Sequence, residues 1–205
     1  MKWIRPPDSE TGVPPDIVSW IQEVGGSERI VTSYARGHAL RLHKLDLKGC
    51  ENVSDLSKLA GFTRWQALDL SGCSNISDLT PLADLTRLQA LDLSGCPNVK
   101  DILPLASLTG CRKLDLSSTQ VSDLSPLSGM RCLMELQLDS TPVVDLSPLT
   151  GMNNLYKVNL NYSQVSDLTP LFSLRDLKTV NFDSTPVPEE HGREFRQALY
   201  RRASQ

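Results

Sequence analysis

Apolar residues return along this chain at nearly constant intervals, so its pattern of hydrophobic and polar positions is a repeat. The first unit is the triplet Leu42, Leu45 and Leu47, which places apolar residues at positions 1, 4 and 6. The remaining triplets are Trp65, Leu68 and Leu70; Leu88, Leu91 and Leu93; Cys111, Leu114 and Leu116; Leu133, Leu136 and Leu138; Leu155, Val158 and Leu160; and Leu177, Val180 and Phe182. Successive triplets begin 23, 23, 23, 22, 22 and 22 residues apart. Each repeat is therefore a coil of nearly constant length.

Two local patterns within each repeat predict its secondary structure. Apolar and polar residues alternate over positions 4 to 6, which is typical of a short strand. A segment such as Leu79-Thr80-Pro81-Leu82 follows, and a proline near the start of a helical turn is well tolerated there. One coil cannot bury its own leucines, but the next coil can cover them. We therefore predict an α/β solenoid: a right-handed horseshoe or arc with a parallel concave sheet, short 3-10 or one-turn convex segments, and helical caps at both ends.

The two ends of the chain depart from the repeat, as capped solenoids require. We expect four segments: a tail at 1–12, an N-terminal cap at 13–40, seven repeats at 41–187 and a C-terminal capping helix at 188–205. Ile17, Trp20, Ile21 and Val24 are at helical spacing, and the β-branched residues at 30–34 favour a cap strand over a second short helix. At the other end, Phe195 and Leu199 are four residues apart, on what would be the inner face of the capping helix.

Composition and charge exclude several classes of protein. The 205 residues carry a formal net charge of −3, without the basic excess that nucleic acids or anionic membranes attract. The chain has no apolar run of signal-peptide length and no stretch of eighteen apolar residues. Its five cysteines are odd in number and contain no Cys-x-x-Cys. We therefore expect a cytoplasmic protein, monomeric when unbound, with no nucleic acid or membrane partner.

Stacking in register turns each repeat position into a column of side chains, and two polar columns invite a metal hypothesis. The column at position 9 is Cys50, Cys73, Cys96, Thr119, Thr141, Ser163 and Thr185; the column before the proline turn is Asp55, Asp78, Asp101, Asp123, Asp145 and Asp167. Zinc and calcium need ligands that converge on one point, whereas a column keeps them parallel. We expect both columns to hydrogen-bond turning backbone, from inside and at the convex turns respectively, and we expect no cofactor or metal.

The column at position 5 points outward from the strands and is the first candidate for partner binding. It consists of Asp46, Asp69, Asp92, Asp115, Gln137, Asn159 and Asn181. Asp69 and Asp92 are flanked on the same face only by alanines and serines. These carboxylates could receive Lys or Arg side chains of a partner; the alternative is a solvated ladder without a ligand.

Further along the chain, the same face becomes mixed in character. Met134 and Tyr156 are at position 2, and Tyr162 stands where the other repeats have glycine or serine. An exposed aromatic ring is a typical anchor of an interface, although the ring of Tyr162 could instead lie on a neighbouring repeat. The candidate partner-binding residues are Asp69, Asp92, Asp115, Met134, Gln137, Tyr156, Asn159 and Tyr162.

These repeats resemble the leucine-rich-repeat family over Leu42 to Val187. The short proline-containing units are most similar to the bacterial internalin and SDS22-like class. The Leu-Asp-Leu-Ser-Gly-Cys-x-Asn turns at 68–75 and 91–98 also resemble the cysteine-containing repeats of F-box adaptors, and 13–18 has a short likeness to the start of an F-box. The resemblance implies an interaction scaffold.

The functional prediction is a protein–protein interaction module, a regulator or adaptor that binds a partner on the concave sheet. One alternative is an exported effector that binds a host protein through the same face. A second is an enzyme with a site on the caps, but His38, His43 and His191 form no apparent triad with a serine or cysteine, and no Gly-rich phosphate loop is present. We therefore predict that the protein is not an enzyme.

Overall fold

The computed structural model describes residues 19–20, 23–24, 44–61, 63 and 65–203, and their central feature is one sheet of parallel strands. The strands are β1 (Lys44–Asp46), β2 (Ala67–Asp69), β3 (Ala90–Asp92), β4 (Lys113–Asp115), β5 (Glu135–Gln137), β6 (Lys157–Asn159) and β7 (Thr179–Asn181). They pair in chain order, and equal repeat positions oppose one another, as in Leu45 with Leu68. The predicted repeat and its register are therefore confirmed.

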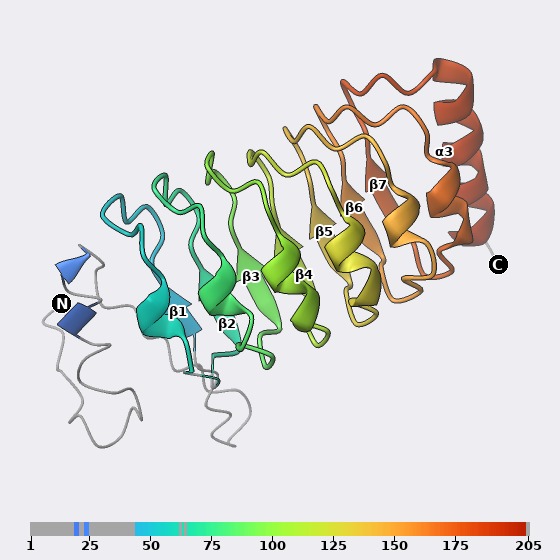
Figure 1. The fold of residues 1–205 in the computed structure, drawn as a ribbon. Coiled ribbons are helices and arrows are strands. Elements are labelled where there is room, and N and C mark those ends of the chain that lie inside the picture. Colours follow the sequence, from blue (N-terminus) through green and yellow to red (C-terminus); the bar gives the residue numbers. More distant parts are fainter. Residues whose placement is uncertain (1–18, 21–22, 25–43, 62, 64, 204–205) are drawn as a thin grey trace, which may run out of the picture.

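The opposite side of each of the first six coils carries a short 3-10 helix, as Figure 1 shows. These helices are η1 (Ser57–Leu59), η2 (Thr80–Leu82), η3 (Leu103–Ser107), η4 (Ser125–Gly129), η5 (Ser147–Leu149) and η6 (Thr169–Ser173). Proline occupies one of the first two positions in all of them except η1, where Lys58 stands at the corresponding place. Because proline fixes φ and lacks only an N–H that the first turn does not use, it favours the start of these helices.

The aspartate column at the convex turns has the structural role expected of it. Asp55 Oδ1 accepts a hydrogen bond from the Ser57 N–H at 2.7 Å. Its equivalents in the next five repeats each accept the N–H two residues later at 2.8 Å. Each carboxylate thus satisfies a donor that the start of a helix leaves unpaired.

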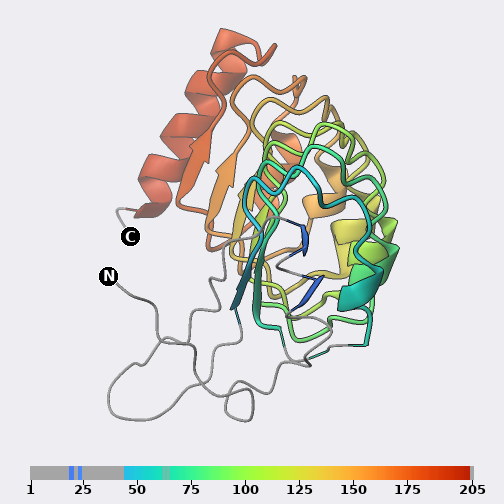
Figure 2. The ribbon, with the colours of Figure 1, turned by 90° about the vertical axis from the view of Figure 1, so that its left-hand side faces the viewer.

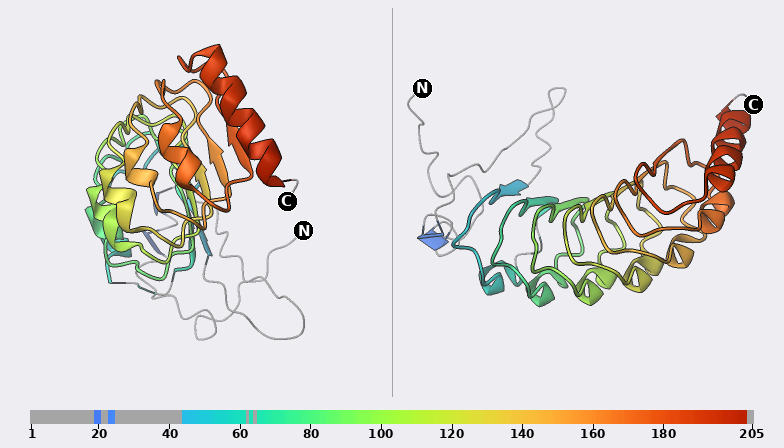
Figure 3. Two further views of the ribbon diagram at one scale, coloured as in Figure 1. Left: turned by 90° about the vertical axis from the view of Figure 1, so that its right-hand side faces the viewer. Right: turned by 90° about the horizontal axis from the view of Figure 1, so that it is seen from above.

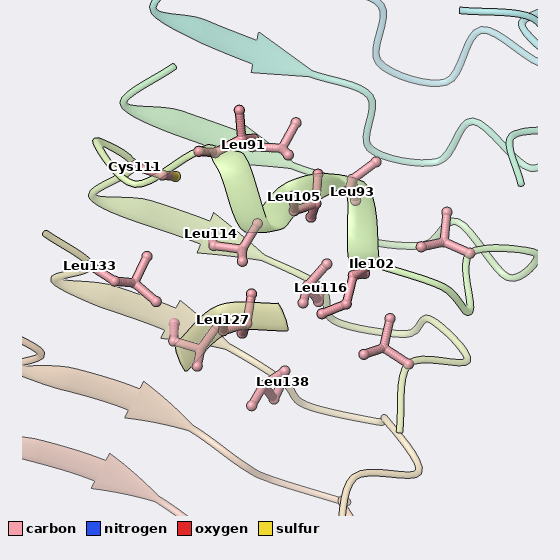
Figure 4. Close-up of a cluster of buried hydrophobic side chains, with 14 of the residues drawn as sticks. Leu91, Leu93, Ile102, Leu105, Cys111, Leu114, Leu116, Leu127, Leu133 and Leu138 are labelled. Carbon is pink, nitrogen blue, oxygen red and sulfur yellow. The ribbon is translucent and has the colours of Figure 1, made fainter. Parts of the chain in front are cut away.

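Leucines fill the space between the sheet and the row of 3-10 helices, so the core continues from coil to coil (Figure 4). Leu91 and Leu114 project from the strands, Leu93 and Leu116 follow them, and Leu105 closes the interior from η3; all are buried. Burying one leucine contributes about 2 kcal/mol. Because each leucine contacts the coil on either side, this stabilisation couples neighbouring repeats.

The column at position 9 bonds the turning backbone from inside, as the sequence predicts. The Sγ of Cys73 donates to the Leu47 carbonyl of the preceding coil at 3.1 Å, and Cys96 donates to the Leu70 carbonyl at 3.2 Å. In the shorter repeats, Thr119 Oγ1 donates to a carbonyl of its own coil at 2.6 Å. Burial raises the pKa of Cys73 to about 12 and that of Cys96 to about 11, so these thiols stay protonated and unreactive.

The predicted capping residues are only partly within the described ranges at the N-terminal end. The Val24 N–H donates to the Trp20 carbonyl at 3.0 Å, one helical turn earlier, and both side chains are buried. The tail at 1–12, the predicted strand at 30–34, the F-box-like residues at 13–18, His38 and His43 lie outside the described residues.

A helix covers the other end of the stack. The helix α3 (Glu189–Ala203) follows the last repeat, and Phe195 on it is buried. The ring of Phe195 meets Phe172 edge to face at 5.0 Å between centroids and Phe182 at 6.2 Å. Arg202 donates to the carbonyls of Leu174 and Phe172 at 3.0 and 2.5 Å. The helix therefore covers leucines that would otherwise face water.

The stack is curved. Seen along its axis, the strands lie on one side of the coils and the 3-10 helices on the other (Figure 2). The right panel of Figure 3 shows that the strands line the inner side of the arc and the 3-10 helices its outer side. The side chains at positions 3 and 5 therefore project from a concave surface.

Candidate functional site

The candidate site is the concave face, which we define as the outward side chains of β1 to β7 and of the residues next to them. Positions 3 and 5, on either side of the central residue of each strand, supply most of it, and that central residue is buried in β1 to β6. From β1 to β6 every residue at position 5 is half-buried. Hydrogen bonds between strands fix the spacing of these side chains at about 4.8 Å along the stack.

The carboxylates at position 5 accept hydrogen bonds from the residue two positions later, at the point where each strand ends. Asp69 Oδ1 accepts the Ser71 N–H at 3.1 Å and the Ser71 hydroxyl at 2.7 Å. Asp92 Oδ1 accepts the same two groups of Ser94 at 2.9 and 2.6 Å. These aspartates are thus also structural, and the Asp-x-Ser spacing was the sequence signal that indicates such a turn.

A hollow of about 350 Å³ lies on the concave face over β2 and β3, and we call it the alanine slot. Its lining residues are Lys44, Ala67, Leu68, Asp69, Ala90, Leu91, Asp92, Lys113, Leu114, Asp115, Glu135 and Gln137. It exists because β2 and β3 have alanine at position 3, whereas β1 and β4 have lysine there. The three carboxylates predicted to bind a partner are thereby placed in one recess.

Asp115 has the least favourable electrostatic environment among the slot carboxylates for which a pKa shift is resolved. Burial raises the pKa of this carboxyl, and the neighbouring charges of Asp92 and Asp139 raise it further. The hydrogen bonds from Ser117 oppose this rise without cancelling it. The charged form of Asp115 is therefore held at a cost in free energy.

Three side chains, on β4, on β5 and immediately before β6, form a bridge beside the slot. The Lys113 ammonium lies 2.5 Å from Glu135 Oε1, and the Tyr156 hydroxyl donates to the same oxygen at 2.6 Å. The two hydrogen bonds lower the pKa of Glu135, and the bond to Glu135 raises the pKa of both Lys113 and Tyr156. We call this set the Lys113–Glu135–Tyr156 bridge.

Polar side chains continue the hydrogen-bonded surface beyond the bridge. Asp139 Oδ1 accepts the Ser117 hydroxyl at 2.6 Å and the Asn159 amide at 3.1 Å. Asn159 Oδ1 accepts the Asn161 N–H at 3.2 Å. Because their partners hold these groups in place, the surface is organised before any ligand arrives, which lowers the entropy lost on binding.

Tyr162 combines exposure with an unusual backbone conformation. Its φ is 58°, in the left-handed region, and its side chain is 63% exposed. Serine or glycine occupies this turn position in the other repeats, also with positive φ. A bulky residue is rarely found in this conformation, and strained residues of this kind cluster at functional sites.

In the structure, the predicted partner-binding residues fall into two groups. Asp69, Asp92, Asp115 and Gln137 line the slot, whereas Met134, in the repeat of β5, and Tyr156, Asn159 and Tyr162, in the repeat of β6, are not among its lining residues. Sequence reasoning did not select Glu135, which ties the two groups together. A usable signal existed, because equal repeat positions pair and the residues beside Glu135 are Lys113 and Lys157.

Other kinds of site are absent from the part of the chain that the structure describes. Within those ranges, no group of three or more His, Cys, Asp or Glu side chains could hold a metal ion. None of the described helices is both long enough and apolar enough to span a bilayer. Of the histidines, His191 is described, and it is exposed on α3.

Comparison with known proteins identifies the family. The profile described as Leucine Rich repeats (2 copies) matches residues 66–107. Internalin C2 from Listeria monocytogenes is 33% identical, with a TM-score of 0.66 over 80% of this chain and 71% of that one. The chain belongs to the leucine-rich-repeat family. Its repeats are of the bacterial internalin type, as the sequence predicts.

More distant structures share the leucine-rich-repeat fold. Internalin F from Listeria monocytogenes is 28% identical, with a TM-score of 0.55 over 70% of this chain and 48% of that one. A plant peptide hormone receptor, RGFR1, solved in complex with RGF2, is 11% identical with a TM-score of 0.53, over 65% of this chain and 27% of that one. At that identity the likeness concerns the fold alone. No curated protein sequence matches this leucine-rich-repeat chain significantly.

Proposed function

We propose that this leucine-rich-repeat protein is an interaction module that holds a protein partner on its concave face. The fold supports protein binding in general, and the plant peptide hormone receptor RGFR1, which has this fold, was solved in complex with RGF2. The observation that carries the proposal for this chain is the Lys113–Glu135–Tyr156 bridge. It links polar side chains of three consecutive repeats on the outward side of the sheet, where the core does not require them.

Both halves of the face contribute features of an interface. The alanine slot offers a recess with charged walls, and Tyr162 offers a ring that is largely exposed on a strained turn. Anchoring aromatic residues and complementary charges are common determinants of interfaces. In this proposal the module is a cytoplasmic regulator or adaptor of its partner. The alternative is a protein that is exported and binds a host protein through the same face. Cell fractionation with a tagged chain distinguishes the two.

The decisive experiment compares two double variants that carry the same change of charge. Gln137→Arg with Asn159→Arg places two long cations on the concave face, where both residues are half-buried. Gln120→Arg with Gln164→Arg places two on exposed loops that follow the turns outside the sheet. Proteins captured by the tagged wild-type chain at moderate salt are identified by mass spectrometry and then measured against both variants.

We expect the concave variant to lose at least about 2 kcal/mol of binding free energy, because truncating or obstructing a central contact costs that much. The loop variant should bind as the wild type does. Equal binding by both variants would mean that the partner docks elsewhere, and circular dichroism of each variant confirms that the fold is retained.

A further inference from the structure

The shape of the alanine slot restricts what can enter it. Lys44 on β1 and Lys113 on β4 are separated by three strand steps of about 4.8 Å, so their backbones are about 14 Å apart. Between them, the side chains of Ala67 and Ala90 end at the methyl group, above the buried leucines of the sheet. The recess is therefore wide enough for one long side chain of a partner, with an apolar floor beneath it.

The alanine slot carries a net negative charge, which favours a positively charged ligand. Its lining contains four carboxylates and two ammonium groups, a formal charge of −2. One of those ammonium groups, on Lys113, is already bound to Glu135 outside the alanine floor. In addition, burial and neighbouring carboxylates raise the pKa of Asp115, so an incoming cation would relieve an unfavourable interaction.

The hydrogen bonding of Asp69 and Asp92 leaves a defined point of contact. Within the part of the chain that the structure describes, the hydrogen bonds from Ser71 and Ser94 go to Oδ1 of these two carboxylates. Oδ2 of each accepts none of these bonds, so an acceptor remains on each of two neighbouring strands. A donor that spans two strands and carries several N–H groups satisfies both.

We infer that the alanine slot receives the guanidinium group of an arginine presented by the partner, an assignment that rests on the proposed function. Arginine fits better than lysine for two reasons. Its planar group presents five donors and reaches two acceptors at once. Its weakly hydrated faces also lie favourably on alanine methyl groups, whereas a lysine ammonium is compact and strongly hydrated.

The test uses defined peptides and the full chain labelled with ¹³C in its alanine methyl groups. The probes are the capped tripeptide Gly-Arg-Gly and its counterparts with citrulline or lysine in the middle, at low salt. We expect the Ala67 and Ala90 methyl signals to shift saturably with the arginine peptide. The citrulline peptide, which lacks the charge, should bind about tenfold more weakly, and the lysine peptide should also bind more weakly. The Ala83 methyl, on the opposite side of the coil, should not move.

Two variants separate shape from charge. Ala90→Leu fills the slot without changing charge, and Asp69→Asn with Asp92→Asn removes charge without changing shape. Each should weaken binding of the arginine peptide about tenfold, read at the Ala67 methyl in Ala90→Leu and at both methyl groups in the aspartate variant. The matched control is Asp84→Asn with Asp176→Asn, two exposed carboxylates away from the sheet, and it should keep the full shift.

Several results would overturn the assignment. Absence of a saturable shift excludes arginine binding in the slot, equal binding of the citrulline peptide excludes the role of charge, and equal binding of lysine excludes selection for a guanidinium. The proposed function fails separately. If a captured partner is lost in Gln137→Arg with Asn159→Arg but retained in Ala90→Leu, docking on the concave face stands and the arginine assignment falls.

Discussion

The same substitution, Asp to Asn, should have opposite effects on stability in two columns of this protein. Asp115 on the concave face has a raised pKa because of burial and neighbouring carboxylates, whereas hydrogen bonds from Ser147 lower the pKa of Asp145 at a convex turn. Asp115→Asn should therefore stabilise the protein at pH 7, and Asp145→Asn should destabilise it. Both variants change the net charge equally, so each is the control of the other.

The size of the first effect follows from the strand spacing. Asp92 and Asp115 are paired residues of adjacent strands, about 4.8 Å apart, and two unit charges at that distance repel by about 0.9 kcal/mol in water. Asp139 adds a second repulsion, so a gain of about 1 to 2 kcal/mol is expected at low salt. For a chain of this length, each kcal/mol raises Tm by about 2 to 4 °C.

The pH dependence of the free energy of unfolding distinguishes the electrostatic explanation from an effect that asparagine would have at any pH. A carboxyl whose folded pKa is raised contributes stability below its unfolded pKa of about 3.9, and that contribution is lost as the pH rises through the folded value. The advantage of Asp115→Asn should thus appear as the pH rises above about 4. A lowered pKa has the opposite sign, so the stability supplied by Asp145 is present above about pH 4 and is lost as the pH falls through its folded pKa.

Urea denaturation of the wild type and both variants at pH 7 and pH 3.5, in low salt and in 0.5 M salt, measures these differences. The reasoning fails if Asp115→Asn lowers the free energy of unfolding at pH 7, or if its effect is the same at both pH values. The part of the gain that comes from repulsion by Asp92 and Asp139 should shrink in 0.5 M salt, because salt screens the interaction between charges.

Three other predictions follow from the core, the caps and the exposed groups. Leu93→Ala should lower the free energy of unfolding by about 2 to 5 kcal/mol in urea denaturation, since the side chain is fully buried. Arg202→Met should destabilise the C-terminal cap by about 1 to 2 kcal/mol, because two hydrogen bonds to carbonyls are lost. The control variant Arg201→Met should have little effect. Hydrogen exchange of the backbone amides in the last repeat measures the difference in stability between the two variants. Cys132 is the one exposed thiol among five free cysteines, so a thiol reagent should modify one site in the native protein and all five after denaturation. Modification of two or more thiols before unfolding would contradict the buried arrangement.

Sequence reasoning succeeded where the physical cause acts within one coil. The spacing of leucines, the proline in the 3-10 helix and the aspartate before that helix are local patterns, and they recur seven, five and six times respectively. Because the same pattern recurs, the secondary structure predicted for one repeat is supported by the others. Stacking of the coils follows because one coil cannot cover its own core. The columns at positions 5 and 9 were predictable for the same reason.

Only the tertiary structure decided how neighbouring coils interact through their longer side chains. The Lys113–Glu135–Tyr156 bridge joins residues that are 22 and 21 positions apart, and its geometry depends on rotamers that the sequence does not specify. The alanine slot likewise needs two short side chains and the turning of Lys113 towards Glu135. The leucines determined the scaffold from the sequence alone because burial is a property of each position in the repeat. The contents of the concave face depended on three-dimensional neighbours, because charge, hydrogen bonding and free space are properties of pairs and groups of residues.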